Sequence, residues 1–348
     1  MTKELRLLES EEFGQPSDKG NLVGVQPYMV VSDYASEDAF LEKLDGYLAV
    51  AKAKGWLSSK TIVVFPEYVG TWLVAAGESA AVYRAETVDR AMLPIVLRHF
   101  FSFLKYVILS PARGRIKYAV FRMKSADMLR IYHSVFSQLA NRYAVTLVAG
   151  SIVLPEITVD EAGAVKITGN KLYNTSLIYH PDGRAHRQVL HKIFPTPIEL
   201  PYTEPGLEEN LPVYDTPAGR LGVLNCADSW YAAPYLKLKS QGVQFLAVAS
   251  YVEKDHFIEL PWRGDNVTPA PPEFDSQDFL KITYDDAWLK YAMAARIHTA
   301  NVHTGINVFL RGKFWDVGSD GSSVIMTGGK VHRGISGEGA ALQNVWIS

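Results

Sequence analysis

The only cysteine of the chain, Cys226, is the residue best suited to covalent chemistry. It follows the apolar segment 221–224 and precedes a segment, 230–240, that is typical of a helix ending before Gly242. A side chain at such a strand-to-helix junction can project from a sheet edge, where backbone N–H groups remain free to bind an anion. A lone cysteine is by default a small buried hydrophobic residue, and two other segments favour a thiol nucleophile here instead.

Two other segments supply the groups that a thiol nucleophile needs. The apolar segment 61–65 is followed by Pro66 and the carboxylate of Glu67, and the segment 171–183 contains a YNT motif and a PDG turn and is followed by Lys192. A free thiol with a pKa of about 8.5 is only slightly ionised at neutral pH. It therefore needs a base to accept its proton and a cation or N–H donor to stabilise the developing negative charge.

The order of these motifs, FPE, then YNT, PDG and HK, then GRLGVLNCAD, resembles that of the nitrilase (carbon-nitrogen hydrolase) superfamily over roughly residues 21–333. The resemblance implies that Glu67 is the base, Lys192 stabilises the oxyanion with the backbone N–H of Ala227, and Cys226 is the nucleophile. Alone, Glu67 and Lys192 would be ordinary surface residues, and their combination with Cys226 favours catalysis. We expect the three groups at strand ends that meet at one sheet edge.

Other residues are candidates for assisting the reaction or binding the substrate. The resemblance implies a second glutamate, and Glu156 is the natural candidate, although two extra residues precede it compared with a compact pattern. Asp228 either caps the helix that follows or has a structural role at the site. Four aromatic residues close to the catalytic positions in sequence either line the site or belong to an aromatic core: Tyr68, Trp72, Trp230 and Tyr251.

The composition is ordinary for a soluble globular enzyme, with 348 residues, 48% hydrophobic and 21% charged. A net charge of -2 gives no indication of nucleic-acid binding. One cysteine excludes an intramolecular disulfide, and the polar N-terminus lacks the apolar segment of a signal peptide, so we expect a cytoplasmic protein. His298 and His303 are poorly spaced for one helical face, and we expect neither a metal ion nor another cofactor.

Strands and helices alternate along the chain, which predicts an α/β layer fold. Residues 1–20 are predicted to be a loosely held arm and residues 21–348 a single domain. The expected strands are 21–31, 61–65, 145–153, 171–179, 185–190, 221–224, 243–249, 307–310 and a closing hairpin over 318–331, and the expected helices are 36–54, 126–142, 230–240 and 286–303. The resemblance implies a four-layer α-β-β-α sandwich that assembles into a homodimer or larger homo-oligomer.

Residues 86–125 form an insertion that a simple strand–helix unit does not require. Apolar residues recur at helical spacing over 93–108, but Arg98, His99 and Lys105 interrupt them, so a membrane-spanning helix is not expected. Five basic residues follow before the first acid, Asp127: Arg113, Arg115, Lys117, Arg122 and Lys124. The plain interpretation is a solvated face beside a core helix, and the alternatives are a lid, a subunit contact or a surface for anionic lipid. Contact with a membrane is not expected.

These observations predict a hydrolase that cleaves a non-peptide C–N bond of a small amide or carbamoyl compound through a cysteine thioester. Ala227-Asp228 stands where true nitrilases often have Trp-Glu, which favours an amide over a nitrile. The alternatives are a nitrilase acting on an organic nitrile, an acyltransferase that passes the acyl group to an amine, and, least favoured, a non-catalytic binding scaffold.

Overall fold

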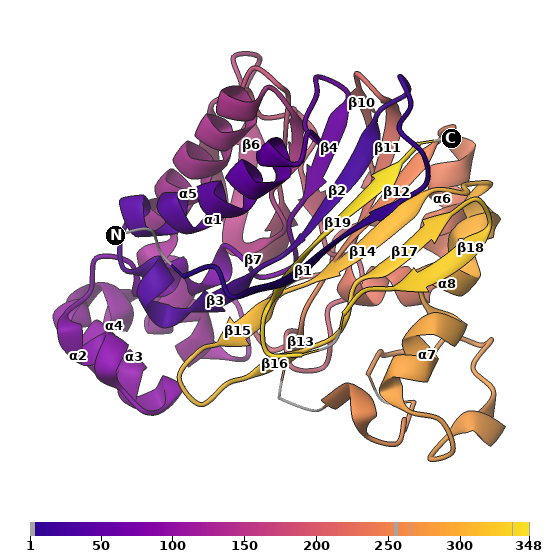
Figure 1. The fold of residues 1–348 in the computed structure, drawn as a ribbon. Coiled ribbons are helices and arrows are strands. Elements are labelled where there is room, and N and C mark those ends of the chain that lie inside the picture. The colour runs from indigo at the N-terminus through magenta and orange to yellow at the C-terminus, as the bar shows by residue number, and fades with distance from the viewer. Residues whose placement is uncertain (1–3, 254–256, 265, 336, 348) are drawn as a thin grey trace.

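Two six-stranded sheets form the centre of the protein (Figure 1). The computed structural model describes residues 4–253, 257–264, 266–335 and 337–347. In both sheets the central strands are parallel. The first sheet has the order β1 (Leu7–Phe13), β19 (Ala340–Trp346), β2 (Asn21–Gln26), β4 (Thr61–Val64), β5 (Thr146–Val148) and β8 (Ile178–Tyr179). The second has the order β10 (Val213–Thr216), β11 (Gly219–Asn225), β12 (Phe245–Ser250), β14 (Gly305–Phe309), β17 (Val324–Thr327) and β18 (Lys330–Arg333).

The two sheets pack face to face through alternate residues of their strands. Leu22 and Val64 of the first sheet share one buried cluster with Ile306 of the second. A Cβ atom on Gly24 would lie 2.4 Å from Cδ1 of Ile306, so the close approach of the sheets requires glycine there. The opposite face of the first sheet, including Val63, packs in a separate cluster with the helices that cover it.

Helices cover both outer faces and complete four layers, as predicted (Figure 1). On the first sheet lie α1 (Glu37–Ala53) and α5 (Arg115–Tyr143), and on the second lie α6 (Ala232–Ser240) and α8 (Met293–Arg296). The predicted cap of α1 is confirmed, since Oγ of Ser36 accepts a hydrogen bond of 3.1 Å from the Ala39 N–H. The predicted helix 286–303 is divided into α7 (Tyr284–Tyr291), α8 and a 3₁₀ turn, Ile297–Ala300.

The prediction that residues 1–20 are a loosely held arm is wrong for the segment that the structure describes. Residues 7–13 form β1, which pairs in parallel with the edge of β19. The hydroxyl of Tyr47 donates to the Leu5 carbonyl at 2.8 Å, and Nζ of Lys43 donates to the Glu4 carbonyl at 2.6 Å. The segment is held because it supplies partners to the backbone groups of β19 and to α1.

Smaller sheets extend the two central ones. A three-stranded sheet consists of β6 (Ile152–Val159), β7 (Val165–Ser176) and β9 (Leu190–His191). Two-stranded sheets join β3 (Tyr28–Val30) to β15 (Arg311–Lys313) and β13 (Val252–Glu253) to β16 (Ser319–Asp320). The predicted strand 145–153 is therefore divided between two sheets, as β5 and the start of β6, because Gly150 turns the chain with a φ of 64°.

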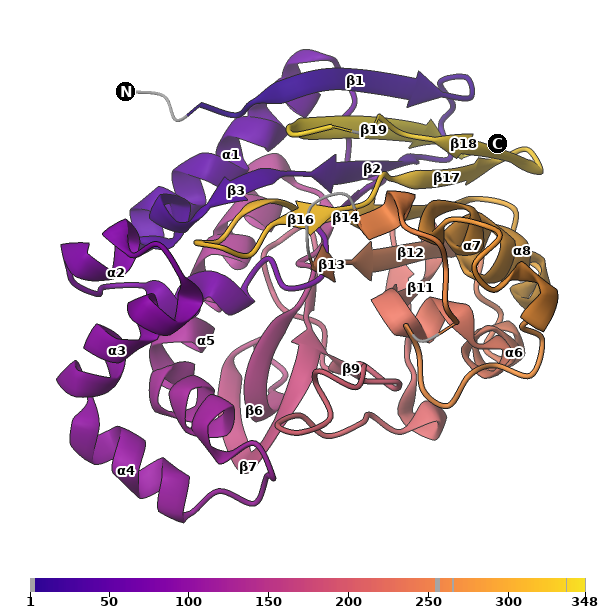
Figure 2. The same ribbon diagram turned by 90° about the horizontal axis from the view of Figure 1, so that it is seen from below.

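The insertion forms a helical layer at the periphery, away from the two central sheets (Figure 2). It contains α3 (Val88–Arg98), α4 (Phe100–Ile108) and the first turns of α5, and α2 (Ala80–Arg84) precedes it. Within the described residues no single helix is long and apolar enough to cross a membrane, although α3 and α4, bent by 100° at their junction, pass that test as a pair.

Candidate active site

Glu67 lies just beyond the carboxyl end of β4, and its side chain is only 1% exposed. The chain turns sharply after it, because Tyr68 adopts a left-handed conformation with a φ of 62°. The N–H of Tyr68 donates to Oγ of Ser151 at 2.9 Å, which holds this turn against the segment that follows β5. The carboxylate is therefore directed inward, where it needs a partner within the protein.

That partner is Lys192, which directly follows β9 and is also buried. Its Nζ lies 2.8 Å from Oε1 of Glu67 and 2.7 Å from Oε2 of Glu199. Two carboxylates thus share one ammonium group, and two of its three N–H groups are directed to them. Its third N–H can donate to a negatively charged oxygen on a substrate.

Glu199 is the second glutamate of this site, and the prediction that Glu156 takes this role is wrong. Glu156 lies on β6 with its side chain exposed, whereas Glu199 is buried in the loop 196–203. Oε2 of Glu199 accepts from the Thr196 N–H at 2.7 Å, and Oε1 accepts from the Tyr68 hydroxyl at 2.5 Å. The signal that sequence reasoning missed is a carboxylate seven residues after the lysine, within a proline-rich segment whose neighbouring side chains are apolar.

The side-chain amide of Asn174 also forms hydrogen bonds with both carboxylates. Asn174 belongs to the YNT motif on β7, for which no role was predicted. Its Nδ2 donates to Oε1 of Glu67 at 2.8 Å and to Oε1 of Glu199 at 2.9 Å. The backbone of Lys192 also donates to the Asn174 carbonyl at 2.8 Å, so one residue fixes the positions of all three charged groups.

Cys226 lies at the predicted junction, immediately after β11 and at the start of a 3₁₀ turn, Cys226–Trp230. Its φ of 46° is left-handed, a conformation that costs a residue with a side chain about 1–3 kcal/mol and is concentrated at functional sites. Its Sγ lies 3.6 Å from the carbonyl oxygen of Tyr251, which follows β12, and the thiol interacts electrostatically with the Glu67 carboxylate. The predicted single sheet edge is wrong, because β4, β9 and β11 belong to three different sheets.

The electrostatics of the site favour a neutral thiol beside a charged ammonium group. Burial raises the pKa of both Cys226 and Glu67, and the charge of Lys192 opposes each shift. Burial would lower the pKa of Lys192, but Glu199 and Glu67 raise it well above its usual value, so the ammonium remains charged. Burial also opposes ionisation of Glu199, but the charge of Lys192 lowers the pKa of this carboxyl below its usual range.

Asp228 connects the segment of the cysteine to that of the lysine. Its Oδ1 accepts from the N–H groups of Ile193 and Phe194 at 2.9 and 2.8 Å, and its Oδ2 accepts from the Asn225 N–H at 3.3 Å. Burial raises the pKa of Asp228 to about 7, although these backbone donors oppose the shift. The residue therefore fixes the backbone beside Lys192 relative to the turn that carries Cys226.

The four aromatic candidates divide into two pairs. Tyr68 and Tyr251 lie at the site, with ring centroids 5.6 Å apart, and contact Glu199 and Cys226 respectively. Trp72 instead stacks on Phe314 with ring centroids 4.3 Å apart, and Trp230 is fully buried among other aromatic rings. The structure thus packs the half-buried Trp72 against the core beside the first sheet, and it places Trp230 in the buried cluster that also contains Cys226 and Ala227.

No group of three or more His, Cys, Asp or Glu side chains in the described parts of the chain is arranged to hold a metal ion. The site as described consists of one thiol, one ammonium group and buried carboxylates. Together they can exchange a proton with a nucleophile and stabilise negative charge on a carbonyl oxygen.

Solved structures with this fold include several forms of one amidase from Nesterenkonia sp. AN1. A mutant of it, after Michael addition of acrylamide at the active-site cysteine, matches with a TM-score of 0.54 and 14% identity over 94% of this chain and 93% of that chain. A cysteine-to-serine mutant, described as from the nitrilase superfamily, matches with a TM-score of 0.54 and 14% identity over 95% and 92%. A cysteine-to-alanine mutant in complex with butyramide matches with a TM-score of 0.53 and 15% identity over 93% and 89%. At this identity the likeness concerns the fold.

Among curated proteins, no sequence matches this chain. A family model does match it: the model described as carbon-nitrogen hydrolase covers residues 22–263, including Glu67, Lys192, Glu199 and Cys226. Because the match extends over more than half of the chain, the chain belongs to the carbon-nitrogen hydrolase family and is a carbon-nitrogen hydrolase of the nitrilase superfamily.

Proposed function

We propose that the chain hydrolyses the C–N bond of a small amide or carbamoyl compound through a thioester on Cys226. The observation that carries the proposal is the placement of Lys192 between Glu67 and Glu199, beside a cysteine in a left-handed turn. This arrangement supplies the three functions that acyl transfer to a thiol needs: a nucleophile, a base and a donor for the oxyanion.

In the first half of the reaction, Glu67 accepts the proton of the Cys226 thiol as the sulfur attacks the carbonyl carbon. A C–S bond forms, and the electron pair of the C=O bond moves to the oxygen. The ammonium of Lys192 and the backbone N–H of Ala227 stabilise this oxyanion, and one such donor is worth about 3–4 kcal/mol of barrier. The oxyanion then collapses, the C–N bond breaks, and Glu67 returns the proton to the departing nitrogen, which leaves as ammonia or an amine.

In the second half, Glu67 accepts a proton from water as the water oxygen attacks the thioester carbonyl. The C–S bond breaks, the proton returns to the sulfur, and a carboxylic acid leaves. Glu199 does not exchange protons in this scheme, because its lowered pKa keeps it ionised. Its role is to hold the ammonium of Lys192 in place with a second charge-assisted hydrogen bond.

An amide is favoured over a nitrile as the substrate. The residues after the cysteine are Ala227 and Asp228, and Asp228 uses its carboxylate to hold the backbone of Ile193 and Phe194. The Nesterenkonia amidase, which shares the fold, is described in complex with butyramide, a small aliphatic amide. The Ala227-Asp228 sequence after the cysteine and the fold shared with this amidase support a small amide.

The experiment is a comparison of matched pairs of aliphatic amides and nitriles, with ammonia release as the readout. We expect release from the amides, loss of release in Cys226→Ala, and an unchanged thermal unfolding midpoint in that variant. Release from the nitriles alone would show a nitrilase instead, and product formation that requires an added amine would show an acyltransferase. Full activity of Cys226→Ala would refute the thioester mechanism.

A further inference from the structure

The peripheral helices α3 and α4 expose an unusual number of large apolar side chains. None of the nine residues of α4 is buried. Phe101 is 84% exposed and Ile108 is 68% exposed, and they lie on one face of the helix together with Leu104. The exposed apolar residues of α3, α4 and the turn after them are Leu93, Leu97, Phe100, Phe101, Leu104, Ile108 and Leu109.

The sequence that includes α4 and most of α3 also has a strong positive charge. Residues 90–126 contain eight lysines and arginines and no aspartate or glutamate, in a chain whose net charge is -2. Arg90, Arg98 and Lys124 form ion pairs with glutamates outside the segment. Lys105, Arg113, Arg115 and Lys117 are exposed, and none of them has an acidic partner among the residues that the structure describes.

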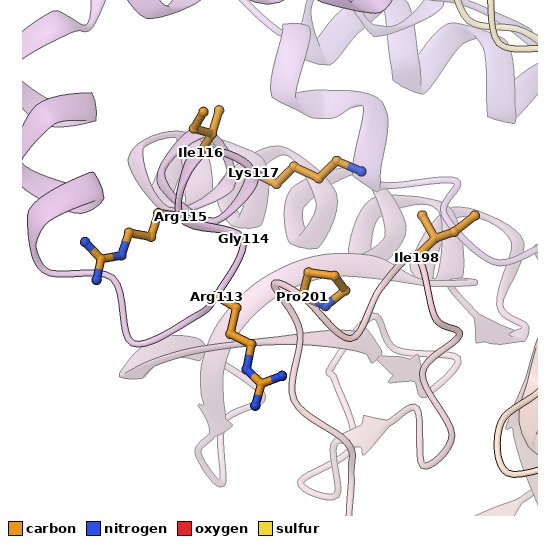
Figure 3. Close-up of a pocket in the computed structure, with 7 residues that line it drawn as sticks. All are labelled: Arg113, Gly114, Arg115, Ile116, Lys117, Ile198 and Pro201. Carbon is orange, nitrogen blue, oxygen red and sulfur yellow. The ribbon is translucent and has the colours of Figure 1, made fainter.

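A pocket of about 450 Å³ continues this surface from the start of α5 to the loop that carries Glu199 (Figure 3). Figure 3 shows Lys117 of α5 extending toward Ile198 of the loop and Pro201 near Gly114, while Ile116 points away from the loop. The Gly114 N–H donates to the Pro201 carbonyl at 2.6 Å, which joins the two segments. Ile116 and Ile198 are 68% and 59% exposed, so apolar side chains again lie among basic ones.

We propose that this surface, which we define as the docking face (α3, α4 and residues 109–117), binds peripherally to an anionic lipid bilayer. Exposed Phe, Leu and Ile side chains insert at the boundary between headgroups and acyl chains, and lysines and arginines are attracted to anionic headgroups. The bend of 100° between α3 and α4 suits helices that lie along the surface of a bilayer.

The positive charge of the docking face also favours a bilayer over a second copy of the chain as the partner that binds there. A two-fold contact through this face would bring the same unpaired lysines and arginines of two copies together. An anionic bilayer instead supplies the negative charge that Lys105, Arg113, Arg115 and Lys117 do not find among the described residues. The observations therefore favour lipid.

The experiment is co-sedimentation of the full chain with vesicles of phosphatidylcholine alone and with about 30% phosphatidylglycerol, at about 0.1 M salt. The test variant is Phe101→Ser with Lys105→Glu, on α4. The control is Leu236→Ser with Lys239→Glu, which makes the same kinds of change at exposed positions of α6. A second test variant, Arg113→Glu with Arg115→Glu, changes the charge alone, and circular dichroism establishes that each variant is folded.

We expect binding to the anionic vesicles, little binding to phosphatidylcholine alone, and affinity reduced by about tenfold or more in both test variants but not in the control. Equal binding to the two kinds of vesicle, or no binding to the anionic ones, would overturn the proposal. Equal binding by the test and control variants would overturn it as well. A dimer that Phe101→Ser with Lys105→Glu converts to a monomer, measured by light scattering without vesicles, would instead identify the face as a subunit contact.

Discussion

The active site and the docking face both concentrate charge, but they differ in where the balancing charge lies. In the site, the ammonium of Lys192 is 1% exposed and has carboxylates at 2.8 and 2.7 Å. On the docking face, Lys105 and Arg113 are exposed and have no acidic partner in the described parts of the chain. A buried ion must be satisfied within the fold, whereas an exposed ion remains available to an external partner. Changes to the buried charged groups of the site should therefore affect stability and catalysis, and changes on the docking face only binding.

The largest expected effect comes from removing the buried cation. In Lys192→Met, Glu67 and Glu199 lose their shared partner inside the protein, so we expect unfolding to become easier by about 3–5 kcal/mol and turnover to be lost. The measurement is urea unfolding together with amide hydrolysis. Lys105→Met is the matched variant on α4 and should change stability by less than about 0.5 kcal/mol. Equal effects of the two variants on stability would remove the distinction between the regions.

A smaller effect is expected for Glu199→Gln. The variant keeps the shape of the side chain but weakens its hold on Lys192, so we expect kcat for a small amide to fall by about a hundredfold. Glu156→Gln is the control, because Glu156 is exposed on β6 and should leave kcat unchanged. Steady-state kinetics of both variants decide between the two glutamates, and a loss confined to Glu156→Gln would contradict the site described above.

The pH dependence tests the base directly. Burial, opposed by Lys192, raises the pKa of Glu67 above its ordinary value of 4.5, and Glu67 must be ionised to accept the thiol proton. Activity is therefore present above this raised pKa and lost as the pH falls through it. Profiles of kcat/KM should show this acid limb above pH 4.5, and in Glu199→Gln the limb should move to lower pH, because the charge of Glu199 contributes to raising the pKa of Glu67. A flat profile down to pH 4.5 would exclude Glu67 as the base.

The smallest expected effect is that of Phe101→Ala on the docking face. Phe101 is 84% exposed, so its truncation should change the free energy of unfolding by less than about 0.5 kcal/mol. Phe136→Ala, within α5, is the matched change in the core, where the fully buried ring should cost about 3–5 kcal/mol. Thermal and urea unfolding provide the comparison. A large loss for Phe101→Ala would mean that α4 belongs to the core after all.

The sequence was sufficient to predict those site residues that directly follow a strand and belong to a short motif. Glu67 and Cys226 follow apolar strands, and the structure places both of them in the cluster around Lys192. The second glutamate could not be recognised in this way. Glu156 follows the predicted strand 145–153, with two extra residues before it, but it lies within β6 with its side chain exposed, while Glu199 enters the site from an irregular loop.

Long-range packing explains the other differences between prediction and structure. Residues 7–13 contain several glutamates and resemble a mobile arm, yet β19 offers them an edge that lies more than 300 residues away in sequence. The apolar run 93–108 has the periodicity of a core helix, but none of the residues of α4 is buried. The sequence pattern of a helix or strand shows which of its faces is apolar. Only the folded structure determines which other residues that face contacts.

The most direct test of the central claim is the rate at which iodoacetamide alkylates Cys226 near neutral pH, followed by mass spectrometry of the cysteine peptide. Cys226 is only 7% exposed, and burial raises its pKa, so rapid reaction requires a base that removes the proton during attack. The expected result is stoichiometric labelling of the wild-type protein and labelling at least about tenfold slower in Glu67→Gln. Equal rates in the two proteins, or a thiol that does not react in either, would contradict the assignment of Cys226 as a nucleophile activated by Glu67.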